Sequence, residues 1–123
     1  MPIEIKYEDG LIRFNASNPV CTADVIAAID RAFGDCPAPF ALWDARGVSL
    51  SAVNATEIQR IVDTAGKHVE RRGANPRSAV VVSDPSNKTL IRLLAAYGEA
   101  FNVGIEFSLF CDMDSARAWL GRD

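Results

Sequence analysis

The chain has 123 residues, of which 49% are hydrophobic and 24% are charged, and its formal net charge is -3. This length predicts one domain, residues 1–123, with enough apolar content to build a core. The composition excludes a disordered chain and a disulfide-dense miniprotein. The slight acidity argues against a nucleic-acid partner held by bulk charge.

The start of the chain and its cysteines predict a cytoplasmic location. The opening sequence lacks the positive and apolar regions of a secretory leader, and no stretch approaches the roughly 20 apolar residues of a membrane helix. Cys21, Cys36 and Cys111 have no CxxC spacing, so we expect free, buried or half-buried thiols instead of a disulfide framework or a zinc site. No membrane insertion is expected.

The N-terminal part predicts a hairpin followed by a helix. Alternating polarity at residues 2–7 is typical of a strand, residues 9–10 (Asp-Gly) favour a turn, and residues 11–14 return as the partner strand. An apolar stripe of helical period then occupies residues 22–34, with Thr22 as its expected N-cap.

The middle of the chain predicts two buried strands around a long helix. The apolar runs at residues 40–44 and 78–82 are typical of strands covered on both faces. Between them we expect the longest helix of the chain, from the capping pair Asn54 and Glu57 to the glycine at position 73.

The C-terminal part predicts helix, strand and helix. Asp84 is the expected cap of a helix whose inward face carries five large apolar residues, namely Leu90, Leu93, Leu94, Tyr97 and Phe101. Residues 105–110 are the last expected strand, and Asp112 or Asp114 caps a short terminal helix. The order ββαβαβαβα predicts an α/β fold with a mixed, mostly parallel sheet of five strands and four helices.

Three segments carry a family resemblance: ALWDARGVSL at residues 41–50, AVVVSDPSNKTLIRLL at residues 79–94 and FCDMDSARAWL at residues 110–120. With the order of strands and helices, they resemble the STAS-like family of SpoIIAA-like fold. The closest likeness is to its small stand-alone bacterial members, which are related to the anti-sigma-factor antagonists. The resemblance implies a non-enzymatic regulatory or interaction domain that binds a protein partner.

The chain departs from the antagonists at their switch. The resemblance implies a phosphorylated serine in an Asp-Ser pair at the start of the helix after the third strand, but residues 47–54 read GVSLSAVN. The pair Asp114-Ser115 opens the terminal helix instead. A phosphoacceptor switch that uses Ser51 or Ser49 is therefore kept as an alternative function.

The carboxyl ends of parallel strands are where ligands bind in open α/β sheets. This rule places the candidate ligand or partner edge at eight polar residues: Asp44, Arg46, Ser49, Ser51, Asn54, Ser83, Asn87 and Lys88. The alternative is that these residues only cap helices. Asp44 and Arg46 stand two apart on a strand and share one face, which suits either a structural ion pair or an acid/base group.

The remaining motifs argue against an enzyme. A single histidine, His68, cannot supply a two-histidine metal site, and Thr64 one turn earlier offers it no carboxylate, which argues against a triad built on this helix face. The cations at residues 67–77 are interpreted as ordinary charge at a helix C-terminus. No phosphate-binding glycine motif occurs. We expect no catalytic residue, no metal and no cofactor.

Two further binding functions remain open. Some relatives by fold, such as the CRAL-TRIO lipid carriers, hold apolar molecules, so a pocket of about 300 Å³ or more beside the helix starts would favour a small apolar ligand. On the helix that Asp84 caps, Ile91 and Ala95 fall outside the main apolar stripe. That second apolar shoulder motivates the hypothesis of a two-fold homodimer.

Overall fold

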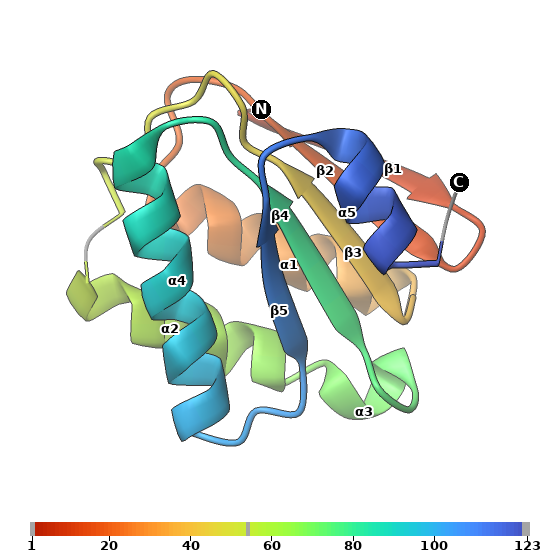
Figure 1. Ribbon diagram of the computed structural model, residues 1–123. Coiled ribbons are helices and arrows are strands. Elements are labelled where there is room, and N and C mark those ends of the chain that lie inside the picture. Colours follow the sequence, from red (N-terminus) through yellow and green to blue (C-terminus); the bar gives the residue numbers. More distant parts are fainter. Residues whose placement is uncertain (1, 54, 122–123) are drawn as a thin grey trace.

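The structure is a computed structural model that describes residues 2–53 and 55–121. Within them, five strands form one sheet in the order β1-β2-β3-β4-β5 (Figure 1). The strands are β1 Ile3–Glu8, β2 Leu11–Ala16, β3 Phe40–Asp44, β4 Arg77–Val81 and β5 Glu106–Phe110. β1 and β2 pair antiparallel, and the pairs from β2 to β5 are parallel. The predicted fold class, α/β with a mixed and mostly parallel sheet, is confirmed.

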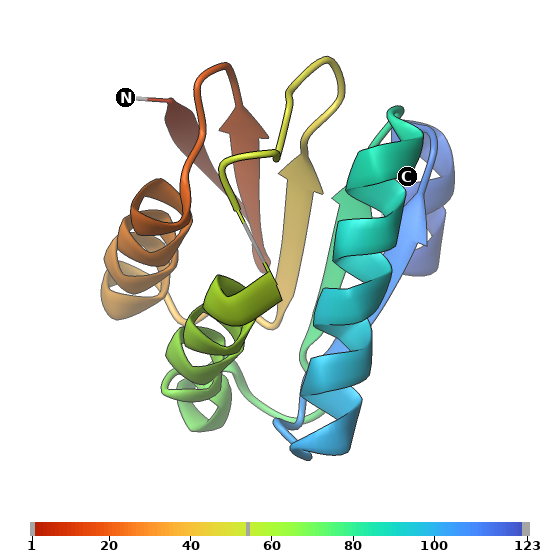
Figure 2. The same ribbon diagram turned by 90° about the vertical axis from the view of Figure 1, so that its left-hand side faces the viewer.

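The helices lie on both faces of the sheet. Those assigned in the described residues are α1 Thr22–Asp35, α2 Ala55–Gly66, α3 Val69–Arg72, α4 Pro85–Ala100 and α5 Met113–Trp119. Figure 2 shows α1, α2 and α4 side by side over one face, with α5 behind the sheet on the other. This arrangement follows from the parallel pairing, because each crossover must return along a face of the sheet.

The core has two parts, one on each face of the sheet. The larger part lies under α1, α2 and α4 and includes Phe14, which stacks on Trp43 with ring centroids 3.9 Å apart. The smaller part joins Leu42 and its strand neighbours to Ala116 of α5 and to Leu120, which follows that helix. Because the inner strands are covered on both faces, their sequences are apolar without alternation, as predicted.

The long helix predicted for residues 54–73 is two helices in the structure. α2 ends at Gly66 and α3 begins at Val69, so α4 and not this segment is the longest helix of the described residues. The N–H of His68 donates to the carbonyl of Ala65, three residues back, which tightens and ends the last turn. Glycine at position 66 weakens the helix at that point. The expected cap Asn54 lies outside the described residues.

The N-cap of α1 is Cys21 and not Thr22. The backbone N–H of Cys21 donates to a carboxylate oxygen of Asp24 at 3.0 Å, and its thiol donates to the same oxygen at 3.2 Å. Thr22 is instead the first helical residue and is buried. Cys21 and Cys111 are exposed, so the expectation of buried thiols was wrong for both. A cysteine takes the capping position because Asp24 completes the hydrogen bonds that the helix start needs.

The caps of the last two helices agree with the sequence. Asp84 accepts a hydrogen bond from the Ser86 N–H at 2.7 Å. Of the two candidates for the terminal helix, Asp112 is the cap, and it accepts from the Ser115 N–H at 2.7 Å. Both helices therefore begin directly after the strands that deliver them to the same end of the sheet.

α4 is rotated relative to the prediction. Leu93 was expected inside but is 36% exposed, whereas Ile91 was expected outside but is buried. The buried side of α4 includes Gly98, whose missing side chain lets the helix approach an aromatic ring of β5. Ile91 therefore cannot form the outer shoulder on which the homodimer hypothesis was built. The exposed large apolar residues of this region are Leu93 and Phe101, and self-association itself stays a prediction.

Candidate functional site

The loops after β3, β4 and β5 meet at one end of the sheet, at the top of Figure 1. We call this surface the carboxyl rim and define it as residues 45–53, 82–84 and 111–112. Two of its loops lead directly into α4 and α5. It is where the sequence placed the candidate edge.

A buried amide holds the largest loop of the rim from below. The side chain of Asn87, on the first turn of α4, is 3% exposed. Its Nδ2 donates to the Val48 carbonyl at 2.6 Å, and its Oδ1 accepts from the Leu50 N–H at 3.1 Å. Asn87 was predicted to belong to the binding edge, and its place in the structure is under the loop, where it positions the exposed residues above.

A second amide holds the same loop from the side. Asn18, in the segment between β2 and α1, accepts from the Ser49 N–H at 2.9 Å and donates to the Gly47 carbonyl at 3.3 Å. Gly47 has a φ of 73°, which a residue with a side chain rarely adopts. Asn18 was not predicted as part of the site, because 31 residues separate it from Ser49 and no local pattern marks such a contact.

Asp44 and Arg46 form a two-pronged ion pair at the end of β3. Arg46 Nε and Nη2 donate to the two carboxylate oxygens of Asp44, each at 2.9 Å, and the Arg46 N–H also donates to Oδ1. Arg13 Nη2 lies 4.0 Å from the same carboxylate. Side-chain hydrogen bonding from Arg46 holds the pKa of Asp44 below its usual value, although burial opposes this. A carboxylate stabilised in this way is a weak base, which favours the structural ion pair over an acid/base group.

The charge of Arg46 also reaches the neighbouring loop. The pKa of Asp112 is lowered mainly by hydrogen bonds from Ser115, and the positive charge of Arg46 adds to that effect. The end of β3 and the start of α5 are therefore close enough to interact electrostatically.

The two candidate serines are exposed on the rim and bind each other. Ser49 Oγ lies 3.0 Å from Ser51 Oγ, and the Ser51 N–H donates to Ser49 Oγ at 3.3 Å. The chain's single histidine, His68, is engaged elsewhere, with its Nε2 2.9 Å from Asp30 Oδ1 on α1. The carboxylate comes from another helix, and not from the neighbouring turn where Thr64 lies.

The remaining candidates lie around the same end. Ser83 is exposed between β4 and α4, and Lys88 is half-buried on the first turn of α4. Asn54 lies outside the described residues. The structure thus brings Asp44, Arg46 and the two loop serines onto one surface with Ser83, and Asn87 supports that surface from within.

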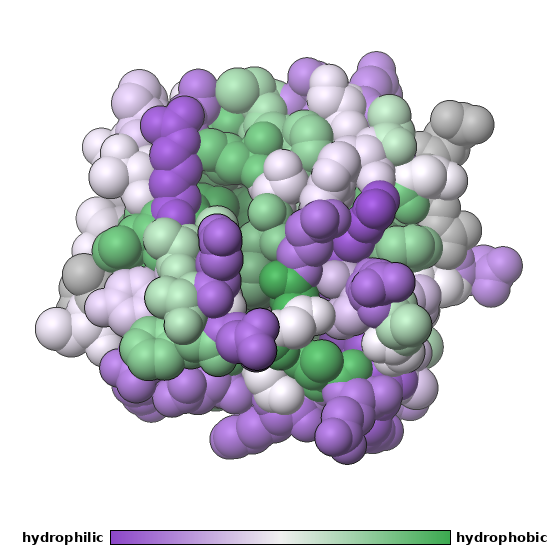
Figure 3. Space-filling model, turned by 60° about the horizontal axis from the view of Figure 1, so that its bottom comes forward, coloured by the Kyte–Doolittle hydropathy of each residue, from purple (hydrophilic) through white to green (hydrophobic). Residues whose placement is uncertain are grey.

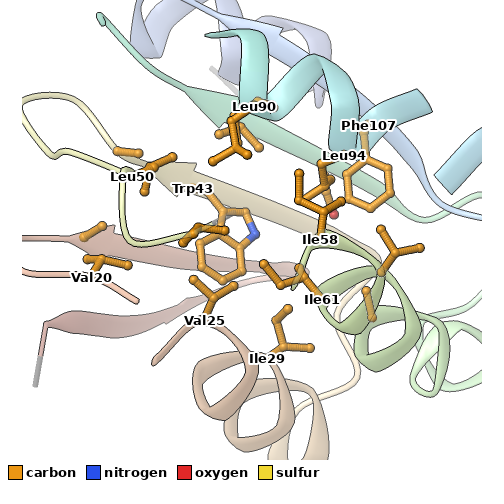
Figure 4. Close-up of a pocket in the computed structure, with 18 of the residues that line it drawn as sticks. Val20, Val25, Ile29, Trp43, Leu50, Ile58, Ile61, Leu90, Leu94 and Phe107 are labelled. Carbon is orange, nitrogen blue, oxygen red and sulfur yellow. The ribbon is translucent and has the colours of Figure 1, made fainter. Parts of the chain in front are cut away.

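An apolar cavity of about 90 Å³ lies between the sheet and helices α1, α2 and α4 (Figure 4). This is below the volume of about 300 Å³ at which binding sites for drug-sized ligands begin. A more open hollow of about 640 Å³ lies at the opposite end from the rim, between the end of α4 and β5. Figure 3 views this end and shows a hollow with a hydrophobic floor and hydrophilic rims. The cavity is too small for a lipid carrier, and the hollow does not lie beside the helix starts where such a site was expected.

The cations predicted to form ordinary charge at a helix C-terminus differ in their burial. Arg71 is exposed and donates to the Gly34 carbonyl at 3.0 Å. Arg72 also lies in the last turn of α3, but it is buried and lines the apolar cavity, so it is more than ordinary charge at a helix C-terminus. The side chain turns inward and donates to the carbonyls of Ala38, Pro39 and Arg77 at the starts of β3 and β4.

Residues 2–53 and 55–121 contain no group of three or more His, Cys, Asp or Glu side chains placed to hold a metal ion. In the same residues, no helix has the length and apolar character needed to cross a membrane.

Comparison with known proteins identifies the architecture. No family model matches the chain, and no curated protein matches it. Among solved structures, the crystal structure of an anti-sigma factor antagonist from Mycobacterium paratuberculosis matches with a TM-score of 0.66 at 18% identity. The match covers 97% of this chain and 92% of that chain. The chain has the SpoIIAA-like fold. In this fold, the segment after the third strand is the loop at residues 45–53, and α2 follows it from Ala55.

Proposed function

We propose that this protein is a non-enzymatic regulatory domain that binds a protein partner through the carboxyl rim. The observation that carries the proposal is the preformed loop at residues 45–53, which two asparagine side chains hold in place. A surface that is already ordered loses little conformational entropy when a partner binds. The fold shared with an anti-sigma factor antagonist supports a protein as the partner.

The chemistry of the rim also favours binding over catalysis. Asp44 is committed to Arg46, and the exposed hydroxyls of Ser49 and Ser51 are hydrogen-bonded to each other. A serine nucleophile needs an adjacent base, and the protein's histidine pairs with Asp30 instead. We place the protein in the cytoplasm, in keeping with its three free thiols.

Site-specific photo-crosslinking in the cells that make the protein tests this proposal. A photoreactive amino acid at Ser51 is expected to give a discrete protein adduct, identified by mass spectrometry. The matched control is Ala74, which is also exposed in a loop but follows α3 at the other end of the sheet. Identical adducts from both positions, or none from the rim serines Ser49 and Ser51, would contradict binding at the rim.

A phosphoacceptor switch on the same loop is the second candidate function. The observation that favours it is the exposure of both hydroxyls, with Ser49 Oγ 3.0 Å from Ser51 Oγ. A phosphate on either serine would break this contact and add a charge of about -1.5 to -2 to the rim. Intact mass measurement of protein taken from its own cells is expected to show one phosphate that survives denaturation and maps to Ser51 or Ser49. Serines that are unmodified in every growth condition would rule the switch out.

A further inference from the structure

The structure holds a buried positive charge without a negative partner. Arg72 is 3% exposed. Its Nε donates to the Ala38 carbonyl at 3.1 Å, and its Nη2 donates to the carbonyls of Pro39 and Arg77 at 3.2 and 3.1 Å. Its Nη1 reaches Ser78 Oγ at 3.4 Å. Every one of these acceptors is neutral.

No carboxylate compensates this charge in the part of the chain that the structure describes. None of the ion pairs formed there includes Arg72, and the guanidinium carbon lies 4.3 Å from the centre of the Phe33 ring. Burial lowers the pKa of Arg72 to about 10, so the side chain is still protonated at neutral pH. Buried charges are normally paired because desolvation is costly, so an unpaired one needs an explanation.

The charge lies at the wall of the apolar cavity. Arg72 and Ser78 line it together with side chains of the sheet and of α1, α2 and α4 that are almost all hydrophobic. A guanidinium has five N–H donors. Four have acceptors, and among the described residues the second N–H of Nη1 has none. The cavity thus combines apolar walls with a positive group that retains donor capacity.

A second donor in the cavity also lacks an acceptor. Trp43 lies on the central strand under the helices, yet its side chain is only half-buried. Figure 4 shows its indole in the middle of the lining side chains, with the nitrogen directed toward Ile58 and Leu94. In residues 2–53 and 55–121 no acceptor pairs with this N–H. Phe14 stacks on the ring and holds its orientation.

We infer that this cavity is a binding site for a small apolar carboxylic acid, whose carboxylate pairs with Arg72 and whose hydrocarbon part occupies the apolar space beside Trp43. The volume of about 90 Å³ limits the occupant. An apolar cavity of about 150 Å³ accepts benzene, so this one suits a chain of about three to five carbon atoms. A lipid does not fit.

The chemistry favours an acid over a neutral molecule of the same shape. A carboxylate supplies the counter-charge that Arg72 lacks, and hydrogen bonds between a guanidinium and a carboxylate are about twice as strong as neutral ones. An amide of the same chain length fills the same space but leaves the charge uncompensated. We therefore expect butanoate to bind at least about tenfold more tightly than butanamide.

The test uses sodium butanoate, butanamide and sodium chloride as probes, with thermal unfolding and tryptophan emission as readouts. Butanoate is expected to raise the Tm and to change the emission, butanamide to do so weakly, and sodium chloride at the same ionic strength not at all. The emission change must come from Trp43, because Trp119 lies on α5 across the sheet. It is therefore expected to persist in Trp119→Phe and to vanish in Trp43→Phe.

A cavity-filling pair of variants gives an independent test that leaves Arg72 intact. Val80 lines the cavity, so Val80→Ile is expected to weaken butanoate binding by reducing the space. The control Val81→Ile adds the same methylene to the next residue of β4, which packs in the core part under α5, and is expected to keep the binding.

Two results would overturn the inference. The first is an equal response to butanoate and butanamide, which would show that the charge of Arg72 selects nothing. The second is that butanoate changes the Tm and the emission no more than sodium chloride does at the same ionic strength. Neither result bears on the carboxyl rim, so this test and that of the proposed function fail independently.

Discussion

Two buried polar side chains hold backbone segments at opposite ends of the sheet, and they do so with different chemistry. Asn87 supports the loop after β3 with two hydrogen bonds, and Arg72 supports the starts of β3 and β4 with bonds to three carbonyls. Both are 3% exposed. The amide is neutral, so once bonded its burial costs little. The guanidinium satisfies the carbonyls but keeps an uncompensated charge.

This difference shows how one five-stranded sheet with its helices can carry two kinds of surface. The neutral side chain of Asn87 holds an ordered loop whose exposed residues are available to a partner. The charged side chain of Arg72 places a positive group at the wall of an apolar cavity, which favours an anion there. Three substitutions test this difference. One removes the side chain of Arg72, one removes that of Asn87, and one removes a charge that belongs to neither.

The largest effect is expected from Arg72→Met, which keeps an unbranched, flexible side chain but is shorter than arginine and removes all its donors. The carbonyls of Ala38, Pro39 and Arg77 lose their bonds from the guanidinium, so the free energy of unfolding should fall by about 3 kcal/mol. Relief of charge burial offsets part of the loss. Denaturant unfolding measures it.

The control is Arg71→Met at the neighbouring exposed position, where a single bond to Gly34 is lost and the expected change is about 0.5 kcal/mol. If the two variants lose equal stability, the bonds of Arg72 do not hold the strand starts together.

A smaller loss, about 2 kcal/mol, is expected from Asn87→Ala, because the Leu50 N–H and the Val48 carbonyl lose their buried partners. The loop should loosen locally as well, so the Leu50 amide should exchange its hydrogen faster than the amides of β3. Hydrogen exchange followed by NMR measures this.

Thr89→Ala is the matched control for that variant. It removes a hydroxyl that bonds to the Pro85 carbonyl on the exposed side of the same helix, and it should leave Leu50 protected. Unchanged exchange of the Leu50 amide in Asn87→Ala would show that the loop does not depend on the side chain of Asn87.

The smallest effect is expected from the Asp44–Arg46 pair, which is partly open to solvent. Asp44 has a folded-state pKa below its unfolded value, so its contribution to stability is present above the unfolded pKa and disappears as the pH falls through the folded one. Its carboxylate is 17% exposed and Arg46 is more exposed still, so screening limits the contribution to about 1 kcal/mol.

Asp44→Asn should therefore be less stable than the parent at neutral pH and equally stable in acid, below the folded-state pKa. Unfolding curves of both proteins over this pH range make the comparison. A difference that stays constant with pH would mean that packing or hydrogen bonding, and not the ionised carboxylate, accounts for the loss.

Local sequence patterns predicted the strands and helices of this fold, but they did not predict contacts between residues far apart in the chain. The buried strands β3 and β4 follow from continuous apolar runs, and the start of α4 follows from Asp84 and Pro85. The rotation of α4 was missed because it depends on how Gly98 meets β5, which the helix's own sequence does not encode.

The candidate site shows the same division. The pairing of Asp44 with Arg46 was predicted because the two residues are neighbours on one strand. The contacts of Asn18 with Ser49, of His68 with Asp30 and of Arg72 with Ala38 join residues 31, 38 and 34 positions apart. Local periodicity carries no information about such pairs, so the inward turn of Arg72 was invisible in the sequence.

The central claim is that a protein partner binds the carboxyl rim. Hydrogen–deuterium exchange of the purified chain, alone and with the partner identified by crosslinking, tests it most directly. We expect the partner to slow exchange at residues 45–53 and at the start of α4, and to leave the loop at residues 73–76 unchanged. Slower exchange at residues 73–76 with no change in the rim loop would contradict binding at the rim.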